Sequence, residues 1–207
     1  MTGIDTPPAA ALILAGGESR RMGSPKAALT IAGETFVGRL VRLLREVGIE
    51  EVLVVTGPDH AATRDALEGT VAELIQTAAP QRGPIGSIAT GIEALGEQRT
   101  SGGLLVAPVD HPAIAASTLT AILTQAQRGP EAIVVPTHEG QRGHPTWFGA
   151  GVLGELRDPQ LAGGARMVVR ADAQRVAEVE VRDPGILRNI DTPEAYAALT
   201  ADWPLPA

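Results

Sequence analysis

The sequence contains no cysteine. A disulfide framework and any thiolate metal site are therefore excluded, while a reducing compartment is permitted. Positive charge is also in short supply, because 17 lysines and arginines face 24 aspartates and glutamates and leave a net charge of -7. An acidic chain is unsuited to general nucleic-acid binding, although one local basic loop is compatible with this balance.

Long apolar runs are missing as well. No run approaches the roughly 18 residues that a membrane helix needs, so we expect neither a membrane nor a nucleic acid as partner. The apolar residues 9–15 follow Asp5 and two prolines, have no basic segment before them and continue directly into glycines. We interpret them as the first strand rather than as a secretion signal, and we expect a cytoplasmic protein.

Aliphatic runs alternate with amphipathic segments along the chain. The 207 residues, 44% hydrophobic and 20% charged, predict one globular domain over residues 1–207, with mobile tails at 1–6 and 203–207. Near-continuous aliphatic strands between helices indicate a mainly parallel sheet covered on both faces. We expect strands at 9–14, 52–55, 71–75, 103–109, 132–136 and 176–181, helices at 35–47, 60–67, 88–95, 117–126, 152–157 and from 193 onward, and a helix or strand at 165–170. The segment 140–148 is rich in turn residues.

The most informative stretch begins where the first strand ends. Gly16 and Gly17 follow the strand, and a loop with Arg20, Arg21 and Lys26 comes next. Glycine lets the backbone bend and approach a ligand, so that N–H groups can point at phosphate oxygens while cations neutralise the charge. The stretch fits neither the P-loop pattern nor the dinucleotide fingerprint.

What this stretch resembles is L-A-G-G-x-S-x-R-M-G-x-x-K, the signature of the MobA-like nucleotidyltransferases. That family includes the enzymes that attach GMP or CMP to molybdopterin, and it is related to sugar-phosphate nucleotidylyltransferases. The resemblance implies a Rossmann-like, three-layer α/β/α fold of the nucleotide-diphospho-sugar transferase type. It also implies an Mg²⁺-dependent transfer of NMP from an NTP to a phosphorylated, molybdopterin-like acceptor, with release of pyrophosphate, and a molybdoenzyme as client. The nucleotide-binding residues would be Leu14, Ala15, Gly16, Gly17, Ser19, Arg21 and Lys26, with Arg21 and Lys26 also acting in catalysis on the phosphates.

Two acidic residues are candidates for the metal. Asp110 follows a buried strand, and its surroundings, P-V-D-H-P, resemble the family's metal-binding D-x-P motif. Asp191, in N-I-D-T-P-E, resembles a C-terminal acidic segment of the family, with Asn189 as its competitor. Mg²⁺ suits such a site because it binds one or two carboxylates and takes other oxygens from phosphates and water. The alternative for each aspartate is to cap the helix that follows it.

Four further residues are considered as ligands of the substrates. Gly86 and Ser87 begin a helix whose free N–H groups could contact a phosphate or base, although a simple strand-to-helix turn would look the same. His144 lies in G-H-P, which resembles the acceptor-pocket segment of the cytidylyltransferase branch, and its alternative role is structural. Arg166 lies in G-A-R, which resembles a segment of the same branch, but Leu161 and Ala162 stand where that branch often has an acidic residue, which weakens the assignment of Arg166.

The branch markers conflict. The segment G-P-I-G at 83–86 resembles the guanylyltransferases, while Pro25 before Lys26 and the G-H-P segment resemble the cytidylyltransferases. The aspartate that usually precedes the lysine in the guanylyl branch is missing, so CTP is slightly favoured over GTP.

Three other functions stay open. One is a sugar-phosphate nucleotidylyltransferase, and another is a non-catalytic nucleotide-binding or cofactor-delivery protein, because a fold and a phosphate loop do not establish turnover. The third is an NAD(P)-dependent oxidoreductase, because residues 149–154 spell G-x-G-x-x-G and Asp172 follows about eighteen residues later. Against it, Pro159 would cut the following helix after about two turns.

Overall fold

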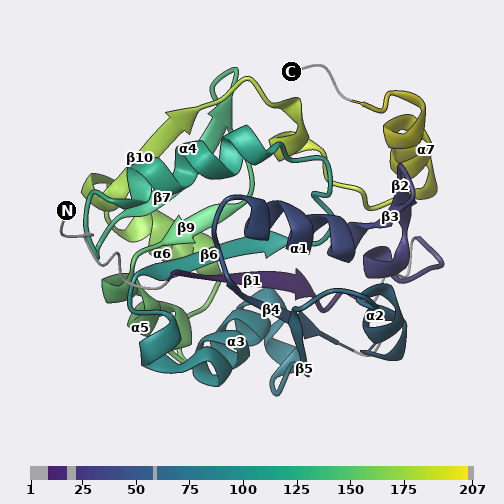
Figure 1. Cartoon of the computed structure of the whole chain (residues 1–207). Helices are drawn as coiled ribbons and strands as arrows, with labels where there is room; N and C mark the ends of the chain where they lie inside the picture. Colours follow the sequence, from purple (N-terminus) through teal and green to yellow (C-terminus); the bar gives the residue numbers. More distant parts are fainter. Residues whose placement is uncertain (1–8, 18–21, 58–59, 205–207) are drawn as a thin grey trace, which may run out of the picture.

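The computed structural model describes residues 9–17, 22–57 and 60–204. In these ranges a mixed, mostly parallel sheet lies between two layers of helices (Figure 1), which confirms the expected fold class. The strands of the sheet are β1 (Ala9–Ala15), β4 (Glu51–Thr56), β5 (Glu73–Gln76), β6 (Gly103–Pro108), β7 (Ile133–His138), β8 (Gln141–Arg142), β9 (Thr146–Phe148) and β10 (Val176–Glu180). Their order is β10-β7-β9-β6-β1-β4-β5, and β8 pairs with β7.

The helices divide between the two faces of the sheet. They are α1 (Phe36–Glu46), α2 (His60–Ala66), α3 (Pro84–Arg99), α4 (Ala116–Ala126), α5 (Leu153–Arg157), α6 (Ala165–Ala171) and α7 (Pro193–Ala201). Helices α1, α4 and α7 contribute to one apolar core, and α3, α5 and α6 contribute to the other. Among the residues described, no helix combines the length and the apolar composition needed to cross a bilayer.

Strand β1 runs through the middle of the sheet. It pairs in parallel with β4 on one side and with β6 on the other. Leu12 and Ile13 are 0% exposed and face opposite cores, because successive side chains of a strand point to opposite faces. A strand covered on both faces must be apolar throughout, which is why residues 9–15 form an unbroken apolar run.

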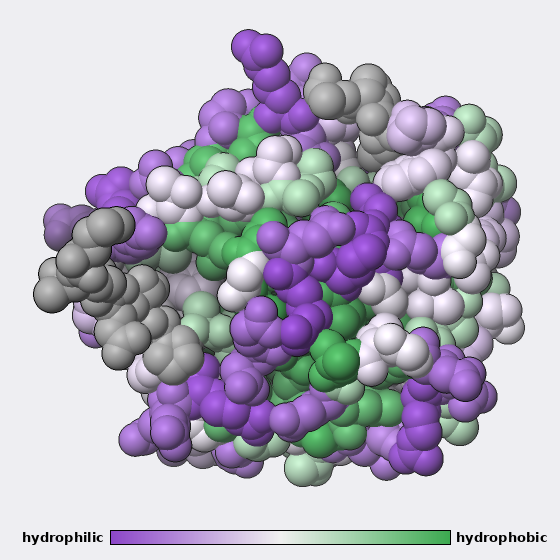
Figure 2. All heavy atoms as spheres, viewed as in Figure 1, coloured by the Kyte–Doolittle hydropathy of each residue, from purple (hydrophilic) through white to green (hydrophobic). Residues whose placement is uncertain are grey.

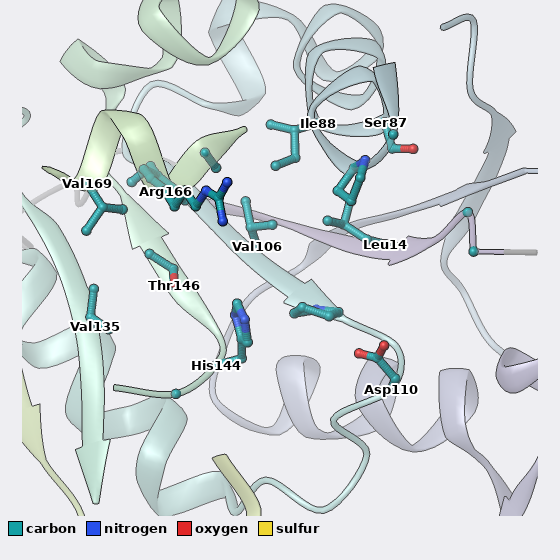
Figure 3. A pocket seen from close by; sticks show the side chains of 18 of the residues that line it. Leu14, Ser87, Ile88, Val106, Asp110, Val135, His144, Thr146, Arg166 and Val169 are labelled. Atoms are coloured by element: carbon teal, nitrogen blue, oxygen red, sulfur yellow. The ribbon is translucent and has the colours of Figure 1, made fainter. Parts of the chain in front are cut away.

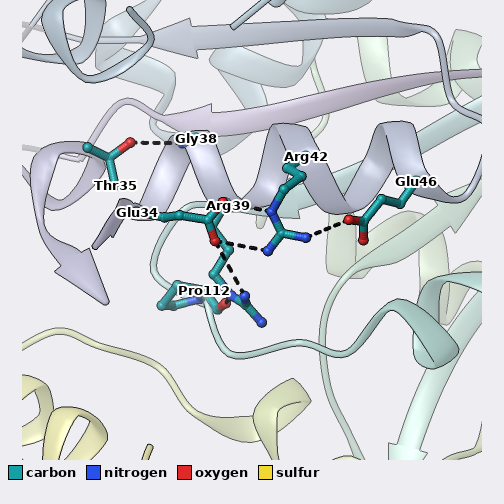
Figure 4. Close-up of polar contacts among 7 residues, drawn as sticks. All are labelled: Glu34, Thr35, Gly38, Arg39, Arg42, Glu46 and Pro112. Atoms are coloured by element: carbon teal, nitrogen blue, oxygen red, sulfur yellow. Dashed lines mark hydrogen bonds and ion pairs between the residues drawn. The ribbon is translucent and has the colours of Figure 1, made fainter. Parts of the chain in front are cut away.

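Helix α1 is amphipathic, and its start is fixed locally. The Thr35 side chain caps it by accepting a hydrogen bond from the Gly38 N–H at 3.1 Å (Figure 4). Strands β2 (Thr30–Ile31) and β3 (Glu34–Thr35) form a small hairpin just before it. Arg42 donates to Glu34 at 2.6 and 2.9 Å, and Figure 2 shows the hydrophilic outer surface of this helix between apolar regions.

The turn-rich segment 140–148 is not merely a connection. It contains β8 and β9, and β9 lies antiparallel between β7 and β6. Trp147 and Phe148 fill the two cores, one on each face, and both are buried. A strand of three residues is too short for a periodic signal, so the expectation of a turn-rich connection missed it.

One other expectation needs correction. The strand expected at 71–75 begins at Glu73, and Val71 is 68% exposed. In the tail expected at 203–207, the Trp203 ring packs against the core and lies 4.6 Å from the Arg39 guanidinium, a favourable contact because a cation over an aromatic face is attractive. The mobility of the tails stays a prediction. Residues 1–6 and 205–207 of the expected tails lie outside the described residues. The segment 165–170, for which helix and strand were both open, is helical in α6.

Candidate active site

A cavity of about 730 Å³ opens at the carboxyl ends of the parallel strands (Figure 3). Ligands of open α/β sheets bind outside this edge, because the loops that follow the strands meet there. Residues from β1, α3, β6, β7, β9 and α6 line the cavity. The residues on its β1 and α3 side include Leu14, Gly16, Gly17, Ser87 and Ile88, and those toward β7 and α6 include Val135, His144, Phe148, Arg166 and Val169.

The glycine loop is packed closely against its neighbours. A Cβ atom on Gly16 would lie 3.1 Å from the Ser87 Oγ, and a Cβ on Gly57 would lie 2.7 Å from the Gly16 carbonyl oxygen. The end of β1 therefore touches both the end of β4 and the first turn of α3, which a larger residue at either glycine would prevent. Ser19 and Arg21, the other expected phosphate ligands of this loop, lie outside the described residues.

Gly86 and Ser87 have different surroundings. A Cβ on Gly86 would lie 2.2 Å from the Ala79 carbonyl oxygen, so the close packing of α3 on the preceding 3-10 turn, Pro80–Arg82, explains this glycine. Ser87 is 4% exposed and lines the cavity next to Gly16. A substrate contact stays a prediction for both residues, and the geometry favours Ser87.

Lys26 brings the two candidate metal ligands together. Its ammonium donates to Asp110 Oδ2 at 3.1 Å and also donates to Asp191 Oδ1, across 84 and 165 residues of sequence. Burial lowers the pKa of Lys26, but the hydrogen bond to Asp191 and the charge of Asp110 outweigh burial and raise this pKa above its ordinary value. Asn189 donates its amide N–H to Asp191 Oδ2 at 3.1 Å and so orients the carboxylate.

Asp110 is held as an anion. Burial raises its pKa, but the hydrogen bond with His111 and the nearby Lys26 ammonium outweigh burial and lower the pKa to about 2. The His111 Nδ1 lies 3.0 Å from Asp110 Oδ1, and the Asp110 carbonyl accepts from the Ile190 N–H at 2.8 Å. Arg39 donates its Nε–H to the Pro112 carbonyl at 2.8 Å and anchors the same segment to α1 (Figure 4).

Neither aspartate caps the helix that follows it. At the start of α4, the Ala115 N–H donates to Asp183 Oδ2 at 2.8 Å, and Asp183 is 5% exposed. At the start of α7, the Ala195 N–H donates to the Thr192 hydroxyl at 3.2 Å, as expected for an N-cap threonine. The capping alternatives for Asp110 and Asp191 are therefore wrong, and both carboxylates instead accept from Lys26.

His144 lies on the cavity wall between Asp110 and the α6 side (Figure 3). Its backbone N–H donates to the Ile186 carbonyl at 3.0 Å, and its ring meets the His111 ring edge-on with centroids 4.8 Å apart. Burial, with the nearby His111, lowers the pKa of His144 to about 4, so the ring is neutral at pH 7. Its buried Nδ1 has no hydrogen-bond partner among the residues described. A Cβ on Gly143 would lie 2.5 Å from the Ile186 carbonyl, which explains the preceding glycine.

The donor set at Lys26 fits a divalent cation. Two carboxylates already converge on one cationic group, and Mg²⁺ needs only one or two carboxylates when substrate phosphates and water complete its shell. Within the described ranges there is no cluster of three or more His, Cys, Asp or Glu side chains placed to hold a metal.

The G-x-G-x-x-G segment at 149–154 does not form a dinucleotide site. It follows the antiparallel strand β9, and α5 after it has only five residues. Cβ atoms on Gly149 and Gly151 would lie 2.1 and 2.0 Å from the Pro130 carbonyl and from Glu131 Oε1. Close packing against the Pro130 backbone explains Gly149, whereas Gly151 faces only the end of the Glu131 side chain. With a short helix after an antiparallel strand, the oxidoreductase alternative loses its structural basis.

Comparison with known proteins agrees with this geometry. Residues 11–178, which include the glycine loop, Lys26 and Asp110, match the model of the MobA-like NTP transferase domain. The chain belongs to this family. Asp191 lies beyond the matched residues.

Several relatives cover different shares of the chain. A probable molybdenum cofactor guanylyltransferase of Opitutus terrae is 34% identical over 125 residues, 60% of this chain and 59% of the relative, so the chain matches less than two thirds of that protein. The purine catabolism protein PucB of Bacillus subtilis is 27% identical over 199 residues, 89% of this chain and 92% of PucB. The crystal structure of Rv0371c from Mycobacterium tuberculosis is 25% identical with a TM-score of 0.76, covering 95% of this chain and 99% of that chain. A second structure of Rv0371c, 24% identical with a TM-score of 0.70 over 94% of this chain and 98% of that one, is a complex with manganese.

Proposed function

We propose that this protein transfers an NMP group from CTP or GTP to the phosphate of molybdopterin, with Mg²⁺ and with release of pyrophosphate. The observation that carries the proposal is the convergence of Lys26, Asp110 and Asp191. Asp110 and Gly17 line the cavity, and the same two residues line a small pocket with Lys26. Cations and carboxylates at this position suit a triphosphate and its metal, and membership of the MobA-like family supports the same reaction.

The reaction needs no nucleophile from the protein. An oxygen of the acceptor phosphate attacks the α-phosphorus of the NTP, a new P–O bond forms, and the bond from the α-phosphorus to the oxygen bridging the β-phosphorus breaks. The electron pair of that bond leaves with pyrophosphate. The protein contributes alignment and charge stabilisation, which supply most of the catalysis in phosphoryl-type transfers.

Each site residue has a role that its surroundings allow. Lys26, with the loop residue Arg21, would bind the phosphates and stabilise the negative charge of the departing pyrophosphate. Asp110 and Asp191 would hold Mg²⁺, which when bound neutralises phosphate oxygens and polarises the α-phosphorus. Leu14, Ala15 and Ser87 would border the nucleotide, and the neutral His144 ring would border the acceptor.

Two donors must be separated. The G-H-P segment at 143–145 favours CTP, and the guanylyltransferase relative favours GTP. We expect one of these two to be used at least tenfold more efficiently, in kcat/KM, than UTP and ATP, and we expect the reaction to take place in the cytoplasm.

Pyrophosphate release tests the proposal. The protein is incubated with Mg²⁺ and each NTP, alone and with molybdopterin or a panel of sugar phosphates. We expect pyrophosphate only when both an NTP and molybdopterin are present, and mass spectrometry should show the dinucleotide product. Turnover with a sugar phosphate but not with molybdopterin would favour a sugar-phosphate nucleotidylyltransferase. Nucleotide binding without pyrophosphate from any pair would favour the non-catalytic alternative.

A further inference from the structure

The end of the cavity remote from Asp110 is lined by arginines. Arg166 and Arg170 are four residues apart on α6, so one helical turn separates them on the same face of the helix. Arg142, from β8, lines the cavity as well. Figure 3 shows Arg166 directed from α6 into the cavity, with Asp110 on the other side.

Two of these arginines have no acidic partner among the described residues. Arg142 pairs with Glu178 at 2.6 Å, and Arg175, just after α6, pairs with Glu155 at 2.5 Å. Arg166 and Arg170 form no ion pair with the part of the chain that the structure describes. The protein carries a net charge of -7, whereas this cavity wall carries two guanidinium groups without an acidic partner among the described residues. The wall is therefore positively charged although the protein as a whole is negative.

An apolar surface separates the arginines from the glycine loop. It consists of side chains from α3, β6, β7, β9 and α6, namely Ile88, Val106, Val135, Phe148 and Val169. In the sheet, β6 and β9 lie between β1, which carries the glycine loop, and β7. A ligand that reaches from the glycine loop to α6 must therefore cross an apolar floor.

We propose that Arg166 and Arg170 form an anion subsite that binds the acceptor and not the triphosphate of the nucleotide. The inference rests on the proposed transfer reaction. The acceptor must approach the α-phosphorus from the side opposite the departing pyrophosphate, because the attacking and leaving oxygens are in line. With the triphosphate held at the glycine loop and Lys26, that side faces His144 and α6. Guanidinium groups there suit an oxyanion because they bind it through paired N–H donors.

The kinetics of two single variants test the subsite. In R166Q and R170Q we expect the KM for the acceptor to rise about tenfold each, since each loses hydrogen bonds to a charged group. The KM for the NTP should stay within twofold. The control is R157Q, which removes an exposed arginine of α5 that does not line this cavity. A rise in the KM for the NTP equal to that for the acceptor, or no change in either, would overturn the proposal.

A binding measurement keeps the subsite testable without turnover. Inorganic phosphate is titrated into the protein in the presence of the α,β-methylene analogues of CTP and GTP, and the Nε–Hε NMR signals of Arg166 and Arg170 are followed. We expect both signals to shift when phosphate is added. In R166Q the shift of the Arg170 signal should be smaller, and in R170Q the shift of the Arg166 signal should be smaller. If neither signal moves, the subsite is refuted even if NMP transfer is found. If both move and no transfer is found, the proposed reaction fails while the anion subsite stands.

Discussion

Replacing Asp110 with asparagine removes one negative charge at the point where three chain segments meet, with almost no change in shape. The carboxylate interacts with the Lys26 ammonium at 3.1 Å and with His111 Nδ1 at 3.0 Å. Its pKa falls from an ordinary 3.8 to about 2. Since one pKa unit corresponds to about 1.4 kcal/mol, the folded protein stabilises the charged form by about 2 kcal/mol.

The sign of this contribution follows from the direction of the pKa change. A carboxyl group with a lowered pKa in the folded state stabilises the protein fully above pH 3.8, and the contribution is lost as the pH falls toward 2. At pH 7 we therefore expect D110N to be about 2 kcal/mol less stable than the wild type, which lowers the Tm of a protein of this size by about 4 to 8 °C. The difference should shrink below pH 4 and vanish near pH 2.

The same substitution should reduce NMP transfer far more than it reduces stability. Loss of a carboxylate that would hold the metal at the reacting phosphates should cost about 100- to 1000-fold in kcat. D202N is the matched control, because Asp202 pairs with Arg188 at 2.7 Å on an exposed surface, where such pairs contribute at most about 1 kcal/mol. Pyrophosphate release at 25 °C and thermal unfolding between pH 2 and pH 8 measure both effects. A D110N enzyme within tenfold of the wild-type rate would remove Asp110 from the mechanism, and an unchanged Tm at pH 7 would refute the electrostatic reasoning.

Three other substitutions probe neighbouring parts of the structure. K26M removes the ammonium that lowers the pKa of Asp110, so this pKa should move up toward 3.8 in a ¹³C NMR titration while kcat/KM falls at least 100-fold; a pKa that stays near 2 would contradict the assigned role of Lys26. H144Q should lose less stability than the wild type at acid pH. The pKa of His144 is about 4 in the folded protein and 6.5 in the unfolded chain, so the wild type loses about 3 kcal/mol of unfolding free energy as the pH falls through that interval. Equal losses of urea-unfolding free energy in the two proteins between pH 7.5 and pH 4.5 would contradict this. D183N replaces a buried carboxylate that accepts hydrogen bonds from Thr118 Oγ1 at 2.6 Å and from two backbone N–H groups. We expect the free energy of unfolding to fall by about 2 to 3 kcal/mol, with kcat unchanged at temperatures below the Tm. A lower kcat in fully folded D183N would show that Asp183 reaches the site.

The positions of the glycine loop and of Asp110 could be predicted from the sequence for a simple physical reason. Both follow long aliphatic strands, and parallel strands end at one edge of a sheet, so residues about ninety positions apart were expected to meet there. The Val109 N–H donates to the Leu14 carbonyl at 3.0 Å and shows how closely these two ends are joined. The same reasoning cannot place Asp191, which follows no strand, and the choice between Asp191 and Asn189 needed the resemblance to a known motif.

What the sequence could not reveal depends on contacts with no local pattern. Strand β9 has three residues, and its antiparallel insertion between β6 and β7 decides which wall of the cavity His144 occupies. The sequence around Arg166 departs from the family's G-A-R segment at Leu161 and Ala162, so the motif alone does not assign Arg166 to the substrate. The structure adds two observations: Arg170 lies one turn later on α6, and neither arginine has an acidic partner among the described residues. Such features arise from tertiary placement, whereas motif matching compares only neighbours in sequence.

The two ends of the cavity differ in the groups that they present. Near Lys26 the described residues bring the carboxylates of Asp110 and Asp191 together, and such groups attract cations. A polyphosphate that binds there can share a cation with these carboxylates. The α6 end carries arginines and needs no cation to hold an oxyanion. This asymmetry suits a reaction in which the nucleotide arrives with a metal and the acceptor arrives without one, so that each substrate is directed to its own end of the same cavity.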